Sequence, residues 1–195
     1  MTRRAKSKLE KVAPNSQPIL KSSAFKAWFG ESKVTDSRGR PQIMYHGTYV
    51  DFDGFNASHA FHCFTPDPLA AEEHANDSYS SFKDDPGGAA IIIMPVYIRS
   101  LKPFDPWTPE CIALMRKWGL GDPSRYDYAI FEDLEDLEVA ARIESLGFDG
   151  IWMRLETPYD MLTIFRPNQV KSAIGNSGRF NPESSSLTDP CCFSL

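Results

Sequence analysis

Short strand-like runs that end in turn residues are the feature that most constrains the fold of this chain. The clearest runs lie in KVTDSRGRPQIMYHGT (33–48), AAIIIMPVYIRS (89–100) and GIWMRLETPYDMLTIF (150–165). The first and the last contain turn residues, at 36–39 and 157–159, and therefore predict strand, turn, strand. Helical patterns fall between the runs at irregular intervals. This arrangement predicts an α+β fold with a mainly antiparallel sheet.

The helical patterns carry their own start and stop signals. Ser23 is a candidate N-cap of a short helix that ends at Gly30, and Asp67 with Pro68 begins another. Pro95 interrupts an apolar run, so we expect a bulge or an edge position there. The first helix should bury Phe25, Trp28 and Phe29, and further helices are expected over 108–121 and 131–150.

The length of 195 residues suits one domain with loose ends. The first stretch is rich in Lys and Arg and has little to bury, which predicts a disordered basic arm over 1–21. Residues 22–182 should form the domain. The last stretch has little periodicity, so we expect a flexible tail over 183–195.

Charge and cysteine usage exclude several classes of protein. The formal net charge of −5 gives the body no general attraction to nucleic acid or to anionic membranes. The basic arm is therefore the only feature of the sequence that favours nucleic-acid binding. No apolar run is long enough to span a bilayer, and we expect no Sec-type signal peptide, because no apolar stretch follows the charges of the first residues. Four cysteines without a CxxC pair favour a reducing compartment, and we expect a cytoplasmic protein or one delivered into a host cell by another route.

Three stretches carry groups that suit a binding cleft. YHGT (45–48) places a histidine before a glycine at a strand end, where a ligand can approach the backbone. FHCFTPDPLAAEEHA (61–75) is an aromatic strand that leads into a helix with a second histidine, and YDMLTIFRPNQVKS (159–172) supplies a carboxylate. A histidine, an aromatic wall and a carboxylate on separate elements can form one cleft.

Other kinds of site fit the sequence less well. His59, His62, Cys63 and His74 do not have the spacing of a common zinc site, so we expect no metal. A nucleophile elbow, a Walker A loop and a GxGxxG motif are all absent from the sequence. The acidic run at 132–138 is typical of a solvated helix face, with a docking patch for a basic partner as the alternative.

In combination these motifs resemble a known family. WFGESKV (28–34), YHGT, FTPDPLAAEEHA, LGFDGI (146–151) and PNQVKSAIGNSGRF (167–180) occur in this order. Together they are similar to the ADP-ribosyltransferase-like domains of phage and mobile-element polyvalent proteins, which are relatives of poly(ADP-ribose) polymerase and diphtheria toxin. The resemblance implies a split β-sandwich of mainly antiparallel sheets around an NAD+ cleft, with NAD+ as co-substrate.

The resemblance assigns a role to each residue of the first motif. His46 is expected to donate a hydrogen bond to the adenosine ribose. Gly47 would hold the nicotinamide amide through its backbone, assisted by Thr48. Tyr45 belongs to the same implied binding set.

The second motif is implied to stack against the nicotinamide ring through Cys63, Phe64 and His74, with Thr65 beside them. The family usually has an aromatic residue where Cys63 stands and a tyrosine where His74 stands. A histidine ring stacks with less area, and a cationic His74 would repel the positive nicotinamide ring. Binding of NAD+ is therefore expected to weaken at acid pH.

The third motif should supply an acid that stabilises the developing oxocarbenium charge. Counting back along the chain from PNQVKS without a gap places Met161 at the position of this acid. Asp160 is the first candidate, because a one-residue bulge would turn it inward, and Glu156 is the second.

The activity that follows is a mono-ADP-ribosyltransferase, a glycosyltransferase of effector, toxin or phage type, with hydrolysis of NAD+ as a further expected reaction. A protein acceptor is favoured over a nucleic-acid acceptor. The alternative is an inactive or weakly active module that binds NAD+, ADP-ribose or a protein. The terminus Cys192–Leu195 has the form of a prenylation signal, although Ser194 is a poor fit and a chance match is favoured.

Overall fold

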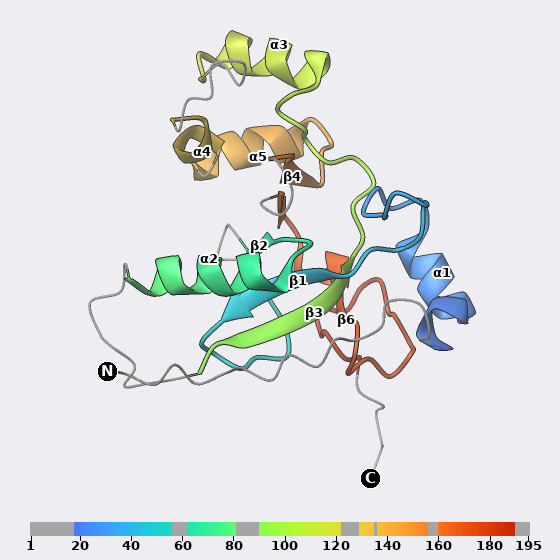
Figure 1. The fold of residues 1–195 in the computed structure, drawn as a ribbon. Helices are drawn as coiled ribbons and strands as arrows, with labels where there is room; N and C mark the ends of the chain where they lie inside the picture. Colours follow the sequence, from blue (N-terminus) through green and yellow to red (C-terminus); the bar gives the residue numbers. More distant parts are fainter. Residues whose placement is uncertain are drawn as a thin grey trace, which may run out of the picture.

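The computed structural model describes residues 18–55, 62–80, 90–121, 129–134, 136–155 and 160–189, and it confirms an α+β fold. The strands form two three-stranded sheets in which neighbouring strands are antiparallel (Figure 1). One sheet has the order β1-β3-β6 and the other has the order β2-β5-β4. Their bounds are Met44–Thr48 (β1), Ile92–Ile98 (β3), Val170–Ser172 (β6), Cys63–Phe64 (β2), Met161–Ile164 (β5) and Gly150–Met153 (β4).

Among the described residues, one bridge connects the two sheets. Tyr45 of β1 donates its N–H to the carbonyl of Thr65 over 2.8 Å, and Thr65 returns a hydrogen bond of 3.0 Å to the carbonyl of Tyr45. Beyond this pair the residues of β1 pair with β3 only. The six strands therefore follow the order β6-β3-β1-β2-β5-β4. Backbone pairing between β1 and β2 stops after the Tyr45–Thr65 bridge, and the two sheets separate there.

The main core fills the space between the sheets. Met44, Val96, Ile98 and Val170 project from one sheet and Phe64, Trp152, Leu162 and Ile164 from the other. In both sheets these residues alternate with residues that face outward, as strand geometry requires. Phe55 and Leu187 close the sides of this core.

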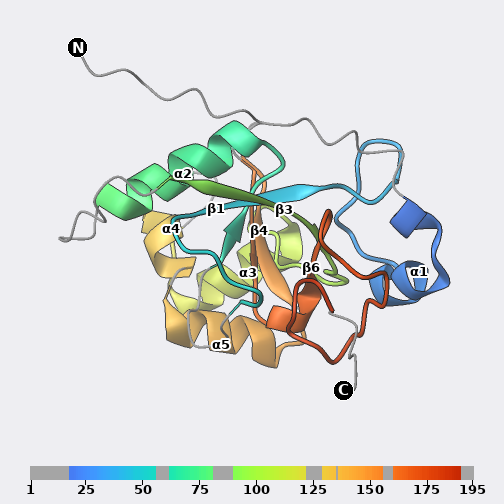
Figure 2. The same cartoon turned by 90° about the horizontal axis from the view of Figure 1, so that it is seen from below.

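Helices cover the outer faces of both sheets. Figures 1 and 2 show α1 (Ser23–Phe29) and α2 (Pro68–Ser80) toward opposite ends of β1 and β3. The short 3-10 helix η1 (Pro18–Lys21) precedes α1, and aromatic residues of α1 pack with Tyr97 in a second buried cluster. A third cluster joins the outer face of β4 to α3 (Pro109–Trp118), α4 (Ala129–Leu134) and α5 (Leu137–Ser145).

Local signals predicted most helix starts, with two corrections. Asp67 accepts hydrogen bonds from the N–H groups of Leu69 and Ala70 at the start of α2, as expected. The N-cap of α1 is Ser22 rather than Ser23. The single helix expected over 131–150 is two helices, because the Asp136 side chain accepts from the N–H groups of Glu138 and Val139 and begins α5 anew.

Pro95 lies in the central strand of its sheet without a bulge, contrary to expectation. The register of β1 with β3 continues past it without a skipped residue. Its carbonyl still accepts from Ala173 at the end of β6, so the missing N–H removes only the last hydrogen bond of that ladder.

Residues on both sides of the expected domain bounds of 22 and 182 contact the domain. Residues 18–21 form η1, and Ile19 and Leu20 pack against the cluster around α1. Residues 183–189 pack against the domain, with Leu187 and Asp189 buried. The rest of the basic arm, residues 1–17, and residues 190–195 with Cys192 lie outside the described residues. No helix in the described part of the chain is long and apolar enough to cross a membrane.

Candidate active site

His46 lies in β1 directly after the bridge that connects the two sheets. Its Nδ1 is 2.9 Å from the backbone carbonyl of Cys63, and because a carbonyl only accepts, Nδ1 carries a proton. The ring is surrounded by other rings, with centroids at 5.1 Å for Phe55, 5.4 Å for Phe64 and 5.9 Å for His62. Packing and a hydrogen bond therefore fix both the position and the tautomer of His46.

The protonation state of His46 changes the role expected from the sequence. Burial lowers its pKa, and nearby His62 lowers it further, against the opposing effect of the hydrogen bond to Cys63. The ring is therefore neutral at pH 7, with its only proton on Nδ1. Its Nε2 is then an acceptor, so His46 can accept a hydrogen bond from a ribose hydroxyl but cannot donate one.

Gly47 is a glycine for a different reason from the one that the sequence suggested. A Cβ at this position would lie 2.0 Å from the backbone oxygen of Ala71 and 3.0 Å from the Cβ of Ala75. Helix α2 therefore occupies the space that a side chain would need, so close packing of the helix on β1 requires glycine here.

The backbone of Gly47 still faces the opening between the sheets. Successive residues of a strand direct their N–H and C=O groups to opposite edges. Tyr45 exchanges both of its hydrogen bonds with Thr65, so Gly47, two residues later, directs its own pair to the same edge. Within the described residues no turn or bridge hydrogen bond uses either group of Gly47.

The residues of the second motif occupy different environments. Phe64 is 0% exposed and packs beneath His46, so it supports that ring rather than forming an open wall. Cys63 has the opposite orientation along β2 and pairs with Thr163. His74 lies on α2, one turn after Ala70, and its Nε2 is buried without a hydrogen-bond partner in the described part of the chain.

Asp160 immediately precedes β5 and needs no bulge to turn toward the inter-sheet side. Met161 packs in the cluster with α3–α5, and β5 keeps a regular register with β4. By alternation Asp160 therefore lies on the same face as Leu162, whose partner in β2 is Phe64. Asp160 and His46 thus both lie on the Phe64 side of this sheet.

The surroundings of Asp160 shift the pKa of its carboxyl in opposite directions. Burial raises the pKa of its carboxyl, nearby Arg154 lowers it, and Asp105 raises it. Arg154 forms an ion pair of 3.0 Å with Asp105, and its guanidinium lies 4.4 Å from the centre of the Trp152 ring. The Oδ1 of Asp160 is buried and has no hydrogen-bond partner among the described residues.

The sequence did not reveal Arg154, Asp105 or Trp152 as neighbours of the acid. A signal was present, because the hairpin places position 154 opposite position 160 once Met153 pairs with Met161.

Thr48 accepts a hydrogen bond from the N–H of Val50 and so shapes the loop that follows β1. Glu156, the second candidate acid, lies outside the described residues.

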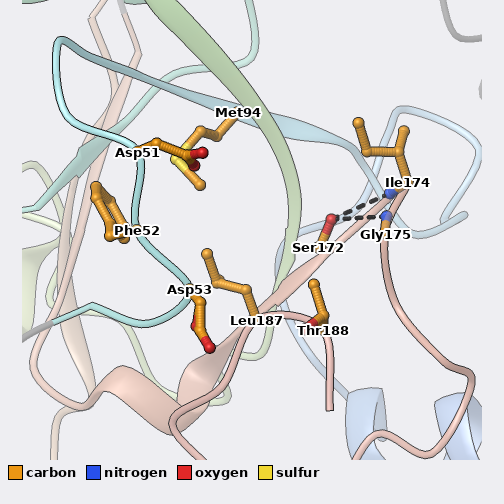
Figure 3. A pocket seen from close by; sticks show the side chains of 9 residues that line it. All are labelled: Asp51, Phe52, Asp53, Met94, Ser172, Ile174, Gly175, Leu187 and Thr188. Atoms are coloured by element: carbon orange, nitrogen blue, oxygen red, sulfur yellow. Dashed lines mark hydrogen bonds between the residues drawn. The ribbon is translucent and has the colours of Figure 1, made fainter. Parts of the chain in front are cut away.

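A hollow of about 570 Å³ is lined by residues of β3 and β6 and of two nearby segments (Figure 3). Met94, which is directly opposite His46 in the register, forms part of its wall, and Phe52 contacts both the hollow and the His46 ring. The remaining lining residues are Asp51, Asp53, Ser172, Ile174, Gly175, Leu187 and Thr188. Sequence motifs did not indicate this hollow, because its walls come from four separate segments.

Metal-ligating side chains do not gather in groups of three or more within the residues that the structure describes, and His59 lies outside them. The arrangement instead combines a neutral histidine acceptor, an open pair of backbone groups and a partly buried carboxyl. Such a set can bind a neutral amide and a sugar and can stabilise a positive charge on that sugar.

Comparison with known proteins gives one family. No curated protein and no solved structure matched the chain. The family model described as ADP-ribosyltransferase in polyvalent proteins matches residues 36–180, which is most of the chain and confirms the resemblance that the motifs indicated. The chain therefore belongs to the family of ADP-ribosyltransferases in polyvalent proteins.

Proposed function

We propose that this chain transfers a single ADP-ribose unit from NAD+ to a macromolecular acceptor and releases nicotinamide. The observation that carries the proposal is the opening between β1 and β2 directly after the Tyr45–Thr65 bridge. His46 and the free backbone edge of Gly47 follow that bridge in consecutive positions. Family membership supports ADP-ribosylation in general, and the geometry supports NAD+ as the donor.

In this proposal His46 and Gly47 bind opposite ends of NAD+. The Nε2 of His46 accepts a hydrogen bond from a hydroxyl of the adenosine ribose. The N–H of Gly47 donates to the carboxamide oxygen of nicotinamide, and its C=O accepts from the carboxamide nitrogen. A strand edge offers this donor and acceptor at a fixed spacing, which suits an amide. Phe64 and Phe55 keep the His46 ring in place.

Asp160 has the catalytic role. Its carboxylate accepts a hydrogen bond from the 2′-hydroxyl of the nicotinamide ribose and stabilises positive charge on that sugar. The bond between C1′ and the nicotinamide nitrogen breaks, and its electron pair leaves with the nitrogen, which makes nicotinamide neutral. A nucleophile of the acceptor then bonds to C1′ and gives up its proton. Water in the same position yields free ADP-ribose, which is NAD+ glycohydrolase activity.

The proposed reaction is a single transfer rather than the formation of a polymer. We propose a protein acceptor, with nucleic acid as the alternative acceptor. A toxin or effector role in the cytoplasm of a host cell is consistent with this activity.

A binding module without turnover is the second candidate function. Three departures favour it: Cys63 and His74 replace the aromatic residues usual in the family, and Met161 stands where the motif count places the acid. In addition, Arg154 already pairs with Asp105 beside Asp160. Such a protein would bind NAD+ or ADP-ribose and leave it intact.

Nicotinamide release from NAD+ by the purified protein tests both candidates. We expect release by the wild type, loss of release in Asp160→Asn, and normal release in the control Glu144→Gln, which neutralises a carboxyl that pairs with Arg166 on the surface. Incubation with NAD+ labelled in the adenosine part, in cell lysate, then identifies the modified macromolecule. Binding without release supports the second candidate. If the protein neither binds NAD+ nor releases nicotinamide, both candidate functions are overturned.

A further inference from the structure

Lys171 is a charged residue with a fully buried side chain, 0% exposed. Its Nζ donates to the carbonyl oxygens of Ser184 and Ser186 over 2.9 and 2.8 Å. It also forms an ion pair with the carboxylate of Asp189, at 2.9 Å from Oδ2, and Asp189 is itself buried. Every proton of the ammonium group therefore has an acceptor, as a stable buried ion pair requires.

These contacts tie one segment, residues 181–189, which we call the strap, to β6. The N–H of Ser172 donates to the carbonyl of Leu187 over 2.8 Å, and the N–H of Asn181 donates to the Asp189 carboxylate. Phe180, directly before the strap, and Asp189, its last residue, have positive φ of 46° and 44°, which side-chain-bearing residues adopt only when their surroundings hold them. The family match ends at residue 180, directly before the strap.

The strap holds the loop that follows β1. The N–H of Leu187 donates to the carbonyl of Asp53 over 2.7 Å, and Gly54 forms a bridge with Ser186. A Cβ on Gly54 would lie 2.9 Å from the oxygen of Ser185, so loop and strap are in direct backbone contact. Leu187 also belongs to the core between the sheets and to the wall of the hollow in Figure 3.

The same loop carries two of the rings that surround His46. Phe55 lies 5.1 Å and Phe52 lies 6.2 Å from the His46 ring, centroid to centroid, both edge-on. A continuous path of contacts therefore runs from Lys171 through the strap and the loop at 52–55 to His46. Each link is a hydrogen bond, an ion pair or a packed ring.

We propose that Lys171 is a positioning residue for His46: its buried ion pair with Asp189 fixes the strap, and the strap holds Phe52 and Phe55 against the histidine. The consequence for NAD+ rests on the proposed function. The consequence for the His46 ring does not, because it concerns the protein without ligand.

The NMR signals of the His46 ring in the ligand-free protein test the proposal. Lys171→Met keeps the length of the side chain and removes the charge. We expect its His46 ring signals to move or broaden, and hydrogen exchange at the Leu187 amide to become faster. Met115→Ala is the control, because Met115 is fully buried in the cluster of α3–α5 and its truncation destabilises the fold without contact to the strap. It should leave the His46 signals in place.

Unchanged His46 signals in Lys171→Met overturn the proposal, and so does an equal change in Met115→Ala. If Lys171→Met does not fold because Asp189 is left buried and unpaired, two further variants replace it. Lys171→Met with Asp189→Asn removes both charges. Ser186→Ala removes a hydroxyl that accepts from the Asp189 amide inside the strap. Both are expected to disturb His46, and unchanged His46 signals in both contradict the proposal.

Calorimetry with NAD+ completes the experiment. If the proposed function holds, the strap variant that folds should bind NAD+ roughly five- to tenfold more weakly, because a displaced ring loses about one hydrogen bond. Absence of NAD+ binding in the wild type refutes the proposed function and leaves the NMR result standing. Equal NAD+ binding by wild type and variant, with shifted His46 signals, removes only the ligand part of the inference.

Discussion

His46 and Cys63 are joined by a hydrogen bond from a side chain to the backbone, 2.9 Å long, at the point where the two sheets part. If β1 and β2 had continued as a ladder, the carbonyl of Cys63 would have received a backbone N–H. The imidazole takes that place instead. The bond keeps the carbonyl satisfied, fixes the ring, and leaves the edge of β1 open to a ligand.

Two amide substitutions separate the roles of the two ring nitrogens of His46. Asparagine places its NH2 near the position of Nδ1, and glutamine reaches the position of Nε2. We expect His46→Asn to keep the bond to Cys63 and the thermal stability but to weaken NAD+ binding about tenfold. His46→Gln should lose about 1 kcal/mol of stability and retain more of the binding. Calorimetry and thermal unfolding measure both, and undiminished NAD+ binding by His46→Asn contradicts the assignment.

Acid should destabilise the protein through His46. Its pKa is lowered in the folded state by burial, so the unfolded chain takes up the proton first as the pH falls. The contribution of the neutral ring is fully present above about pH 6.5, the ordinary value for histidine, and is lost as the pH falls through the lowered folded value. Urea unfolding between about pH 7.5 and pH 5 should therefore show a steeper loss of stability in the wild type than in His46→Asn. Parallel curves would argue against a buried neutral ring.

The acid limb of NAD+ turnover should respond to the two charges beside Asp160 in opposite directions. Asp160 acts only when ionised, and burial raises the pKa of its carboxyl while Arg154 lowers it and Asp105 raises it. We expect Arg154→Gln to move the acid limb to higher pH and Asp105→Asn to move it to lower pH. Initial rates of nicotinamide release across the pH range provide the test. Shifts of the same sign would show that the titrating group is elsewhere, with Glu156→Gln as the next variant to measure.

Gly47→Ala should damage the fold before it affects a ligand. The added methyl group would lie 2.0 Å from a backbone oxygen of α2, so the helix must move away from β1. We expect a loss of about 2 kcal/mol or more, within the range for overpacked sites. Gly121→Ala is the control, since its Cβ would meet no atom closer than 3.5 Å and its φ is not positive. Thermal unfolding of both variants settles the comparison, and equal melting temperatures would refute the packing explanation.

Features with local causes were predictable from the sequence. The cap at Asp67 and the buried aromatic face of α1 depend on residues within a few positions of each other. Long-range structure was less accessible. Lys171, remote in sequence, contacts Ser184, Ser186 and Asp189 in the stretch for which the sequence alone indicated no packing.

Several residues in the motifs that identified the family support the fold. Asp149 of LGFDGI accepts a hydrogen bond from Ser100, and Gln169 of PNQVKS donates to the carbonyls of Arg99 and Asp149. The motifs therefore predicted the fold more securely than the site. The orientation of Asp160 follows from the pairing of β4 with β5. Counting residues back from the PNQVKS motif arrived at Met161, because such a count contains no information on strand pairing.

The strap also decides where this domain can be cut. A recombinant fragment that stops at residue 180, the edge suggested by similarity, would keep Lys171 in the interior and delete the carboxylate that neutralises it. Such a fragment should be insoluble or poorly folded for an electrostatic reason, whatever its catalytic residues. Fusion proteins and minimal versions of the domain should therefore extend at least through Asp189.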